Sequence, residues 1–265
     1  MPREIDYSLL DRPEILQFVF YPRRDWTTAP PGAADYMVPV EENVRISCRF
    51  YPVGPEAPTL LYFHGNGEVA SDHDWIAPIY NRQGISLFVA DYRGYGRSDG
   101  RPSFSAMTRD AHTILRLFQE IRQAEHYDGP VFVMGRSLGS HSALELAAHH
   151  ASELRGVIIE SGLSSPSRLL RFLPGGFDAQ EAIEDFERAS IERIRSITLP
   201  ILIMHGEWDS IVPLEQALVL HENVGSRDRR LLIVPRAEHN DIMLVGHEAY
   251  FGNISLFVQD YSTSS

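Results

Sequence analysis

The stretch VFVMGRSLGSHSALELAA, residues 131–148, decides the fold. It begins with an apolar run, continues through GRSLG at residues 135–139, and passes directly into a helical pattern of apolar residues. A strand, a sharp turn and a helix that carry G-x-S-x-G are typical of a nucleophile elbow, which holds its serine hydroxyl above a sheet. The two glycines fit this interpretation, because side chains there would crowd the turn. We therefore predict that Ser137 is a nucleophile.

A second stretch, GRSDG at residues 96–100, matches the same pattern. Its serine, Ser98, follows the polar, glycine-containing residues 91–95 rather than an apolar strand, and Pro102 follows shortly after. A helix does not begin smoothly at such a position. We therefore interpret Ser98 as a loop serine. The alternative for Ser137 itself is a purely structural turn serine.

The composition restricts the classes of function. The chain of 265 residues suits one large α/β domain, and its hydrophobic content of 43% supports a sizeable core. Its net charge of −12 disfavours nucleic acid and anionic membranes as partners. All 24 basic residues are Arg and none is Lys, which excludes Schiff-base chemistry, a Ser–Lys dyad and a P-loop lysine.

The chain termini and cysteine content predict a cytoplasmic protein. Glu4 and Asp6 precede any apolar run, so the N-terminus does not fit a signal peptide. No apolar run approaches the length of a membrane span. The single cysteine, Cys48, excludes an internal disulfide, so nothing in the sequence favours an oxidising compartment.

Short apolar segments alternate with helical patterns along most of the chain. We expect strands at residues 38–40, 44–51, 59–63, 85–90, 131–134, 157–159, 201–204 and 231–234. We expect helices over residues 105–122, after the elbow, and over residues 214–222 and 247–260. This alternation predicts a mostly parallel sheet with helices on both faces. Ligands bind at the carboxyl ends of strands in such sheets. In this chain, short clusters of polar residues directly follow the predicted strands and therefore lie at these ends.

The division of the chain follows from the same pattern. We interpret residues 1–37 as an N-terminal extension packed on the core, in which residues 15–21 fit either a strand or a short covering helix. Residues 38–162 and 197–265 form the predicted core. Residues 163–196 between them interrupt the alternation of strands and helices.

A serine hydroxyl needs a base to take its proton, and that base needs an orienting acid. In α/β sheets that carry a nucleophile elbow, the three catalytic residues follow one another along the chain as Ser, then Asp or Glu, then His. His239 follows the last predicted strand and is the candidate base, whereas His247, the alternative, opens the final helix. Asp209 follows the penultimate strand and is the candidate acid. Glu160, at the end of the strand after the elbow helix, is the alternative acid.

An oxyanion hole requires two backbone N–H groups. We expect Leu138 to supply one and the turn HGNG, residues 64–67, to supply the other from Asn66. No G-x-G-x-x-G or G-K-[ST] pattern accompanies this turn, which disfavours phosphate binding. His149 and His150 are adjacent and therefore face different sides of a helix, so we expect no metal site.

Four motifs together resemble those of the α/β-hydrolase superfamily: HGNG at 64–67, DYRGYGRS at 91–98, GRSLGS at 135–140 and HGEWDSIVP at 205–213. The resemblance is to its serine-hydrolase branch, which includes Bem46-like and monoacylglycerol-lipase-like proteins and S33-type peptidase relatives. It extends over roughly residues 38–260. It implies the α/β-hydrolase fold with an eight-stranded, mostly parallel sheet, the triad Ser137, Asp209 and His239, and no cofactor. The serine at the elbow disfavours dehalogenase relatives, which carry an aspartate there.

The same resemblance implies that residues 163–196 form a small helical lid inserted between strands. Its apolar residues include Phe172 and Phe177, which we expect to line a substrate pocket. Packing of these side chains inside the lid is the alternative.

The predicted function is that of a serine hydrolase. We expect it to cleave small-molecule carboxylic esters with small to medium acyl chains through an acyl-serine intermediate. An amidase, peptidase or thioesterase with the same triad is the first alternative, because these activities share the motifs. A non-catalytic ligand sensor on the same fold is the second, although an intact Ser, His and Asp set argues against it.

Overall fold

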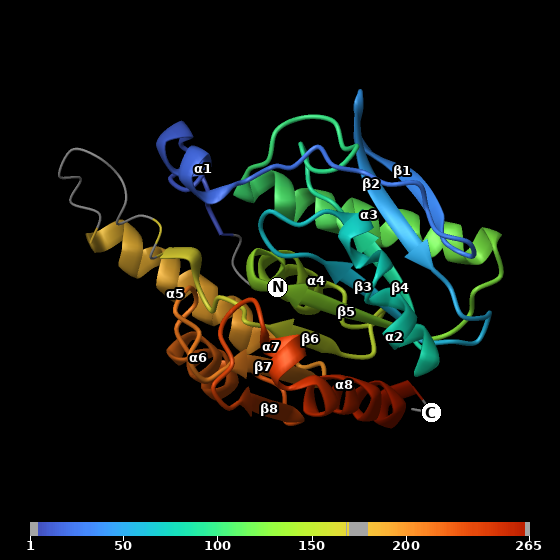
Figure 1. Cartoon of the computed structure of the whole chain (residues 1–265). Helices are drawn as coiled ribbons and strands as arrows, with labels where there is room; N and C mark the ends of the chain where they lie inside the picture. Colours follow the sequence, from blue (N-terminus) through green and yellow to red (C-terminus); the bar gives the residue numbers. More distant parts are fainter. Residues whose placement is uncertain (1–4, 168, 170–179, 263–265) are drawn as a thin grey trace.

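A computed structural model describes residues 5–167, 169 and 180–262. Its centre is a sheet of eight strands in the order β1-β2-β4-β3-β5-β6-β7-β8 (Figure 1). Strand β2 is antiparallel to β1 and to β4, and every other neighbouring pair is parallel. The strands are β1 Ala34–Glu41, β2 Val44–Tyr51, β3 Thr59–Phe63, β4 Ser86–Ala90, β5 Val131–Arg136, β6 Val157–Glu160, β7 Ile201–Gly206 and β8 Arg229–Val234. The predicted α/β-hydrolase fold with a mostly parallel sheet is confirmed.

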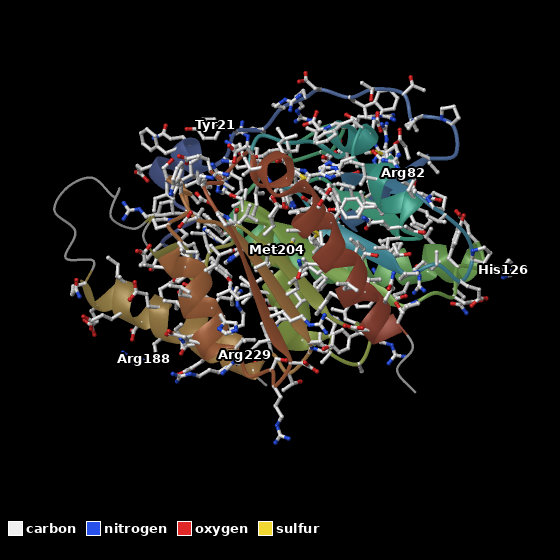
Figure 2. The ribbon with its side chains drawn as sticks, turned by 60° about the horizontal axis from the view of Figure 1, so that its bottom comes forward. Tyr21, Arg82, His126, Arg188, Met204 and Arg229 are labelled. Atoms are coloured by element: carbon white, nitrogen blue, oxygen red, sulfur yellow. The ribbon has the colours of Figure 1, made fainter. Side chains whose placement is uncertain are left out.

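Helices cover both faces of this sheet. They are α1 Pro13–Val19, α2 Ala77–Arg82, α3 Phe104–Ala124, α4 Ser140–His149, α5 Gln180–Ser196, α6 Glu215–Asn223, α7 Ile242–Val245 and α8 His247–Ser262. Apolar residues of α2, α7 and α8 pack on one face, and those of α1, α3, α4, α5 and α6 pack on the other. Figure 2 shows Met204 of β7 in the middle of the molecule, whereas the labelled Arg188, Arg229 and His126 lie at its periphery. In the described ranges no helix has the length and apolar character needed to cross a membrane.

The central strands are buried on both faces. Every residue of β3, β4, β5, β6 and β7 is buried. Parallel strands that are buried on both faces have continuous apolar sequences. The positions of these strands could therefore be predicted closely from the sequence. Strand β5 continues past the predicted end at Met134, because Gly135 pairs with Ile159 and Arg136 pairs with Glu160. Strand β1 begins at Ala34, earlier than predicted, through its pairing with β2.

The N-terminal segment lies against the core. Of the two readings left open for residues 15–21, the helix is the one observed, as α1. Pro13 suits the first turn of α1, where its missing N–H costs no hydrogen bond. Leu10 and Ile15 are buried in the main apolar cluster, whereas Phe18 is 63% exposed.

The segment after β6 contains the long helix α5. Its residues Phe186, Ala189 and Ile194 are buried in the main apolar cluster. Phe172 and Phe177, predicted to line a pocket, lie outside the described residues. The boundaries of the N-terminal extension, core and lid therefore stay predictions.

The elbow brings backbone atoms of three segments into close contact. After β5, a short turn over Ser137–Gly139 leads into α4. A Cβ at Gly135 would collide with the carbonyl oxygen of Gly139, and one at Gly139 would collide with the carbonyl oxygen of Phe63 on β3. Both glycines are therefore required by the close approach of the backbone.

The steric requirement at Gly139 predicts a loss of stability on substitution. Gly139→Ala forces backbone atoms apart and should lower the free energy of unfolding by about 1–3 kcal/mol, the usual cost of overpacking. Gly252→Ala is the matched control, because Gly252 lies inside α8 with open space around its Cα. It should raise stability by about 0.5–1 kcal/mol, since glycine is unfavourable inside a helix. Urea unfolding of both variants measures the difference, and equal stabilities would contradict the packing described here.

Candidate active site

Ser137, His239 and Asp209 form one hydrogen-bonded chain, although each follows a different strand. The Nε2 atom of His239 lies 2.9 Å from Ser137 Oγ, and its Nδ1 atom lies 2.7 Å from Asp209 Oδ2. A carboxylate accepts hydrogen bonds, so Nδ1 carries the proton and Nε2 is free to accept the serine proton. The three residues are 9%, 5% and 6% exposed, respectively. The structure therefore brings all three predicted residues together in the geometry that nucleophile activation requires.

The backbone of Ser137 lies in the left-handed region, with φ of 49°. A residue with a side chain rarely adopts this conformation unless its surroundings impose it. One such contact comes from the Ser140 hydroxyl, which donates to the Ser137 carbonyl oxygen at 2.6 Å. The same hydroxyl accepts from the backbone amide of Leu163 at 3.1 Å, so the segment after β6 helps to hold the elbow.

The carboxylate of Asp209 is held by the turn that follows β7. Its Oδ1 atom accepts from the backbone amides of Ile211 at 3.0 Å and Val212 at 2.7 Å. Burial acts to raise the pKa of Asp209, but the hydrogen bonds from His239 and from the Val212 amide outweigh burial and hold the pKa below its usual value. The acid is therefore ionised at neutral pH and fixed in one orientation.

The alternative acid, Glu160, has other partners. Its side chain is fully buried and accepts from Arg136 Nε at 3.0 Å and from the Tyr250 hydroxyl at 2.6 Å. Burial raises the pKa of Glu160, and the charge of Arg136 opposes that rise. The alternative base, His247, is the first residue of α8, and its ring packs beside Phe251 at 5.0 Å between centroids. Among the described contacts, neither alternative joins the chain that contains Ser137.

Ser98 has a structural environment. It is fully buried, and its hydroxyl accepts from the backbone amide of Ser47 at 2.9 Å. The loop position predicted for Ser98 is the one observed, between β4 and α3. This serine therefore braces the start of β2 rather than facing a cleft.

Arg136 is a residue of the site that the sequence analysis did not single out. Its guanidinium donates to Glu160, to Glu68 after the HGNG turn, and through Nη2 to the His239 carbonyl oxygen at 3.1 Å and Asn240 Oδ1 at 3.0 Å. It therefore connects the elbow to the end of β6 and to the loops that follow β3 and β8. A signal was present in the sequence, because an arginine between an apolar strand and a glycine-flanked serine must find acceptors when buried.

The two residues predicted to form the oxyanion hole border the same cleft as Ser137 and His239. Asn66 is fixed through its side chain, whose Oδ1 accepts from the Tyr95 hydroxyl at 2.7 Å and from the Tyr21 amide at 3.0 Å. Its own backbone amide donates to no acceptor in the described part of the chain. Leu138 lies in the first turn leading into α4, where amides lack helical partners. Their role as oxyanion donors stays a prediction.

A cleft of about 720 Å³ opens over Ser137. Most of its wall is apolar: Phe18, Val19, Leu138, Leu163, Pro166, Leu169, Ile211 and Val212. A concave, mostly apolar pocket with a few polar groups is typical of small-molecule sites. Part of this wall comes from α1 and the residues after it. The sequence predicts that this segment packs on the core, but no motif in the sequence connects the segment with the site.

The sequence of this chain is similar to those of known hydrolase-family proteins. A family model described as "Serine aminopeptidase, S33" matches residues 54–176. The chain is 31% identical to Protein bem46 of Schizosaccharomyces pombe over 78% of its length and 69% of that protein's. It is 32% identical to alpha/beta hydrolase domain-containing protein 17B of Xenopus tropicalis, over 84% of its length and 74% of that protein's.

Solved structures with a similar fold include hydrolases. An esterase from Pyrococcus furiosus superposes with a TM-score of 0.71 at 16% identity, covering 91% of this chain and 99% of that chain. A soluble variant of monoglyceride lipase from Saccharomyces cerevisiae, solved with a substrate analog, gives a TM-score of 0.67 at 20% identity, covering 93% and 100%. At these identities the likeness concerns the fold. Taken with the closer sequence relatives, it shows that the chain belongs to the α/β-hydrolase superfamily.

Proposed function

We propose that this hydrolase cleaves carboxylic esters through an acyl-serine intermediate on Ser137. The observation that carries the proposal is the hydrogen-bonded chain Asp209–His239–Ser137, which ends at the floor of an apolar cleft. A serine activated in this way attacks carbonyl carbons. An apolar wall beside it favours a substrate with a hydrocarbon acyl chain.

The proposed reaction runs in two steps at one site. His239 Nε2 takes the proton of Ser137 Oγ as the oxygen attacks the ester carbonyl, and the backbone amides of Leu138 and Asn66 stabilise the oxyanion. The imidazolium then protonates the alcohol oxygen, the C–O bond breaks, and the alcohol leaves an acyl-serine. Water attacks this acyl group with His239 as base again, and the carboxylic acid leaves as Ser137 regains its proton. The ionised Asp209 stabilises the imidazolium in both steps.

The cleft favours an ester over a peptide with a free N-terminus. An aminopeptidase must hold the substrate ammonium, for which a carboxylate is the usual partner. Among the described residues that line the cleft, none is Asp or Glu. Its one charged residue, Arg136, already contacts Glu68 and Glu160. A matched pair of a p-nitrophenyl ester and the corresponding anilide separates the two activities, and absence of turnover of either would favour a ligand sensor.

The nucleophile assignment predicts opposite results at two serines. Ser137→Ala removes the attacking oxygen, and a comparable removal in a serine protease lowers kcat by about 10⁶. Hydrolysis of p-nitrophenyl esters should therefore be lost with the fold intact, as circular dichroism would show. Ser98→Ala should keep kcat and lose only stability, by about 1–3 kcal/mol, because it leaves the buried Ser47 amide without its acceptor. Loss of kcat in folded Ser98→Ala would contradict the assignment of Ser137 as the nucleophile.

The acid assignment predicts unequal effects at two buried carboxylates. Asp209→Asn cannot stabilise the imidazolium and holds the wrong tautomer of His239, so kcat should fall by about 10⁴. Glu160→Gln keeps an acceptor for Tyr250 and should lower stability more than kcat. Normalising kcat to the fraction of protein that a phosphonate labels corrects for unfolded material. A larger loss of kcat in Glu160→Gln would transfer the role of the acid to Glu160.

The apolar wall predicts a dependence on acyl-chain length. Each buried methylene contributes about 0.8 kcal/mol, or roughly a fourfold rise in kcat/KM while the pocket accommodates the chain. Phe18→Ala should reduce that rise for longer p-nitrophenyl esters and leave the acetate ester unchanged. Leu256→Ala is the control, because Leu256 is similarly exposed at 58% but lies on α8, away from the cleft. An unchanged dependence on chain length in Phe18→Ala would show that α1 does not line the acyl pocket.

A further inference from the structure

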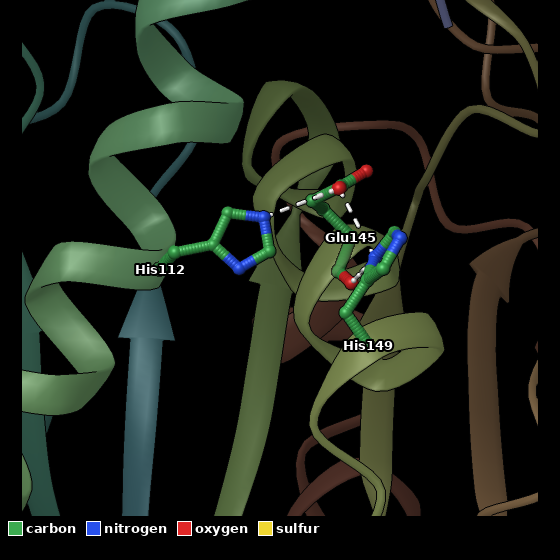
Figure 3. Close-up of side chains that lie close together, drawn as sticks. All are labelled: His112, Glu145 and His149. Carbon is green, nitrogen blue, oxygen red and sulfur yellow. Dashed lines mark hydrogen bonds and ion pairs between the residues drawn. The ribbon is translucent and has the colours of Figure 1, made fainter. Parts of the chain in front are cut away.

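Three side chains with metal-binding atoms meet at a place away from the cleft. His112 comes from α3, and Glu145 and His149 come from α4 (Figure 3). His149 is the last residue of α4, whereas Ser137 precedes its first residue. The cluster is therefore separated from the catalytic serine by the whole length of this helix.

The distances suit a small divalent cation. His112 Nε2 lies 3.2 Å from Glu145 Oε1, and His149 Nδ1 lies 3.1 Å from the same oxygen. All three ligand atoms lie within 4.8 Å of one another. In a tetrahedral zinc site, bonds of about 2.0–2.2 Å place ligand atoms about 3.3–3.6 Å apart. Two of the three distances between the ligand atoms are thus already close to this spacing.

Two further residues extend the cluster in a line. His112 Nδ1 lies 2.7 Å from His150 Nε2, and His150 Nδ1 lies 2.7 Å from Glu153 Oε1. Two imidazole rings therefore connect the carboxylates of Glu145 and Glu153 through three hydrogen bonds. Both carboxylates accept, so protons are required on His112 Nε2 and on His150 Nδ1, and the bond between the rings needs a third. Two neutral rings supply only two protons.

A third proton on the pair satisfies this count, and a metal ion on His112 Nε2 satisfies it with two protons. His112 then donates from Nδ1 to His150, and His150 donates from Nδ1 to Glu153, with both rings neutral. Metal-ligating histidines usually donate their other ring N–H to such a partner, which fixes the ring and its tautomer. The arrangement around His112 therefore matches that of a ligand with its supporting hydrogen bonds.

We propose that His112 Nε2, Glu145 Oε1 and His149 Nδ1 bind a divalent transition-metal ion, with Zn²⁺ as the representative. Imidazole and carboxylate ligands suit this class of ion, and three protein ligands leave a position for water. In the structure His149 Nδ1 donates to the Glu145 carbonyl oxygen at 2.9 Å. Coordination therefore requires His149 to give up this hydrogen bond and to carry its proton on Nε2, which the exposed position of its side chain permits.

Glu145 is prepared to act as a ligand. Arg193 Nη1 donates to its Oε2 atom at 3.1 Å, which leaves Oε1 facing the histidines. The sequence predicts no metal site, because His149 and His150 face different sides of a helix and His112, which completes the cluster, comes from another helix.

The expected function of the ion is to join α3 to α4. Such a site exists only in the folded chain, so binding stabilises the native state. Full-length protein freed of metal with a chelator should bind one Zn²⁺ with micromolar or tighter affinity, and its Tm should rise on addition of Zn²⁺.

Variants separate this site from binding elsewhere. His112→Ala and His149→Ala should each abolish micromolar Zn²⁺ binding and the rise in Tm. His112→Gln is a second variant, because it keeps a donor for Glu145 but removes the imidazole. His150→Ala should weaken binding by about 10–100-fold, the usual effect of removing a supporting hydrogen bond. His221→Ala, on α6, is the control and should bind as the wild type does.

The proposal is overturned if wild-type protein binds no Zn²⁺ with micromolar affinity. Binding that persists in folded His112→Ala or His112→Gln would equally overturn it and would direct attention to His239 instead. None of these measurements depends on ester hydrolysis, so the result stands whether or not the proposed activity is found.

Discussion

The contact between the elbow and strand β3 is the constraint on which the site depends. The backbone at Gly139 approaches the Phe63 carbonyl so closely that no side chain fits between them. This approach places the turn of Ser137–Gly139 directly over the carboxyl end of β3, beside the HGNG turn that follows it. The left-handed conformation of Ser137 then turns its hydroxyl toward His239. The position of the predicted nucleophile, Ser137, and its proximity to the predicted oxyanion donors thus follow from one steric arrangement.

Buried arginines hold the other loops in place. Arg49 joins Asp35 to Asp74, Arg136 joins Glu68 to Glu160, and Arg193 joins Glu145 to the hydroxyl of Tyr7. In each case the two partners come from segments far apart in the chain. The guanidinium has five donors in a rigid plane and can contact two partners at once, which an ammonium does less well. These three arginines use this property in a chain without lysine, and removal of one partner of such a buried pair typically costs about 3–5 kcal/mol.

Local patterns made most of the fold predictable. Strands buried on both faces appear as apolar runs, and the elbow carries a motif with a steric meaning, so β3, β5 and the serine were identified from the sequence. The relations between distant segments were not visible. Glu160, like Asp209, follows the apolar part of a strand. Only the structure shows that its carboxylate accepts hydrogen bonds from Arg136 and Tyr250.

The N-terminal segment shows how the cleft and the predicted oxyanion donor are connected. Near its start, Tyr7 accepts from Arg193 of α5. Near its end, the backbone around Val19 and Tyr21 contacts the side chain of Asn66 through both of its amide atoms. Asn66 thus holds this part of the apolar wall through its side chain, and its backbone amide has no acceptor among the described residues. In the proposed reaction Asn66 would serve both purposes, with its side chain fixing the wall beside the acyl chain and its backbone amide stabilising the oxyanion. The wall and the predicted donor would then be fixed relative to each other. A substrate that fills the wall would be positioned for attack by Ser137, so that binding energy far from the ester favours the transition state.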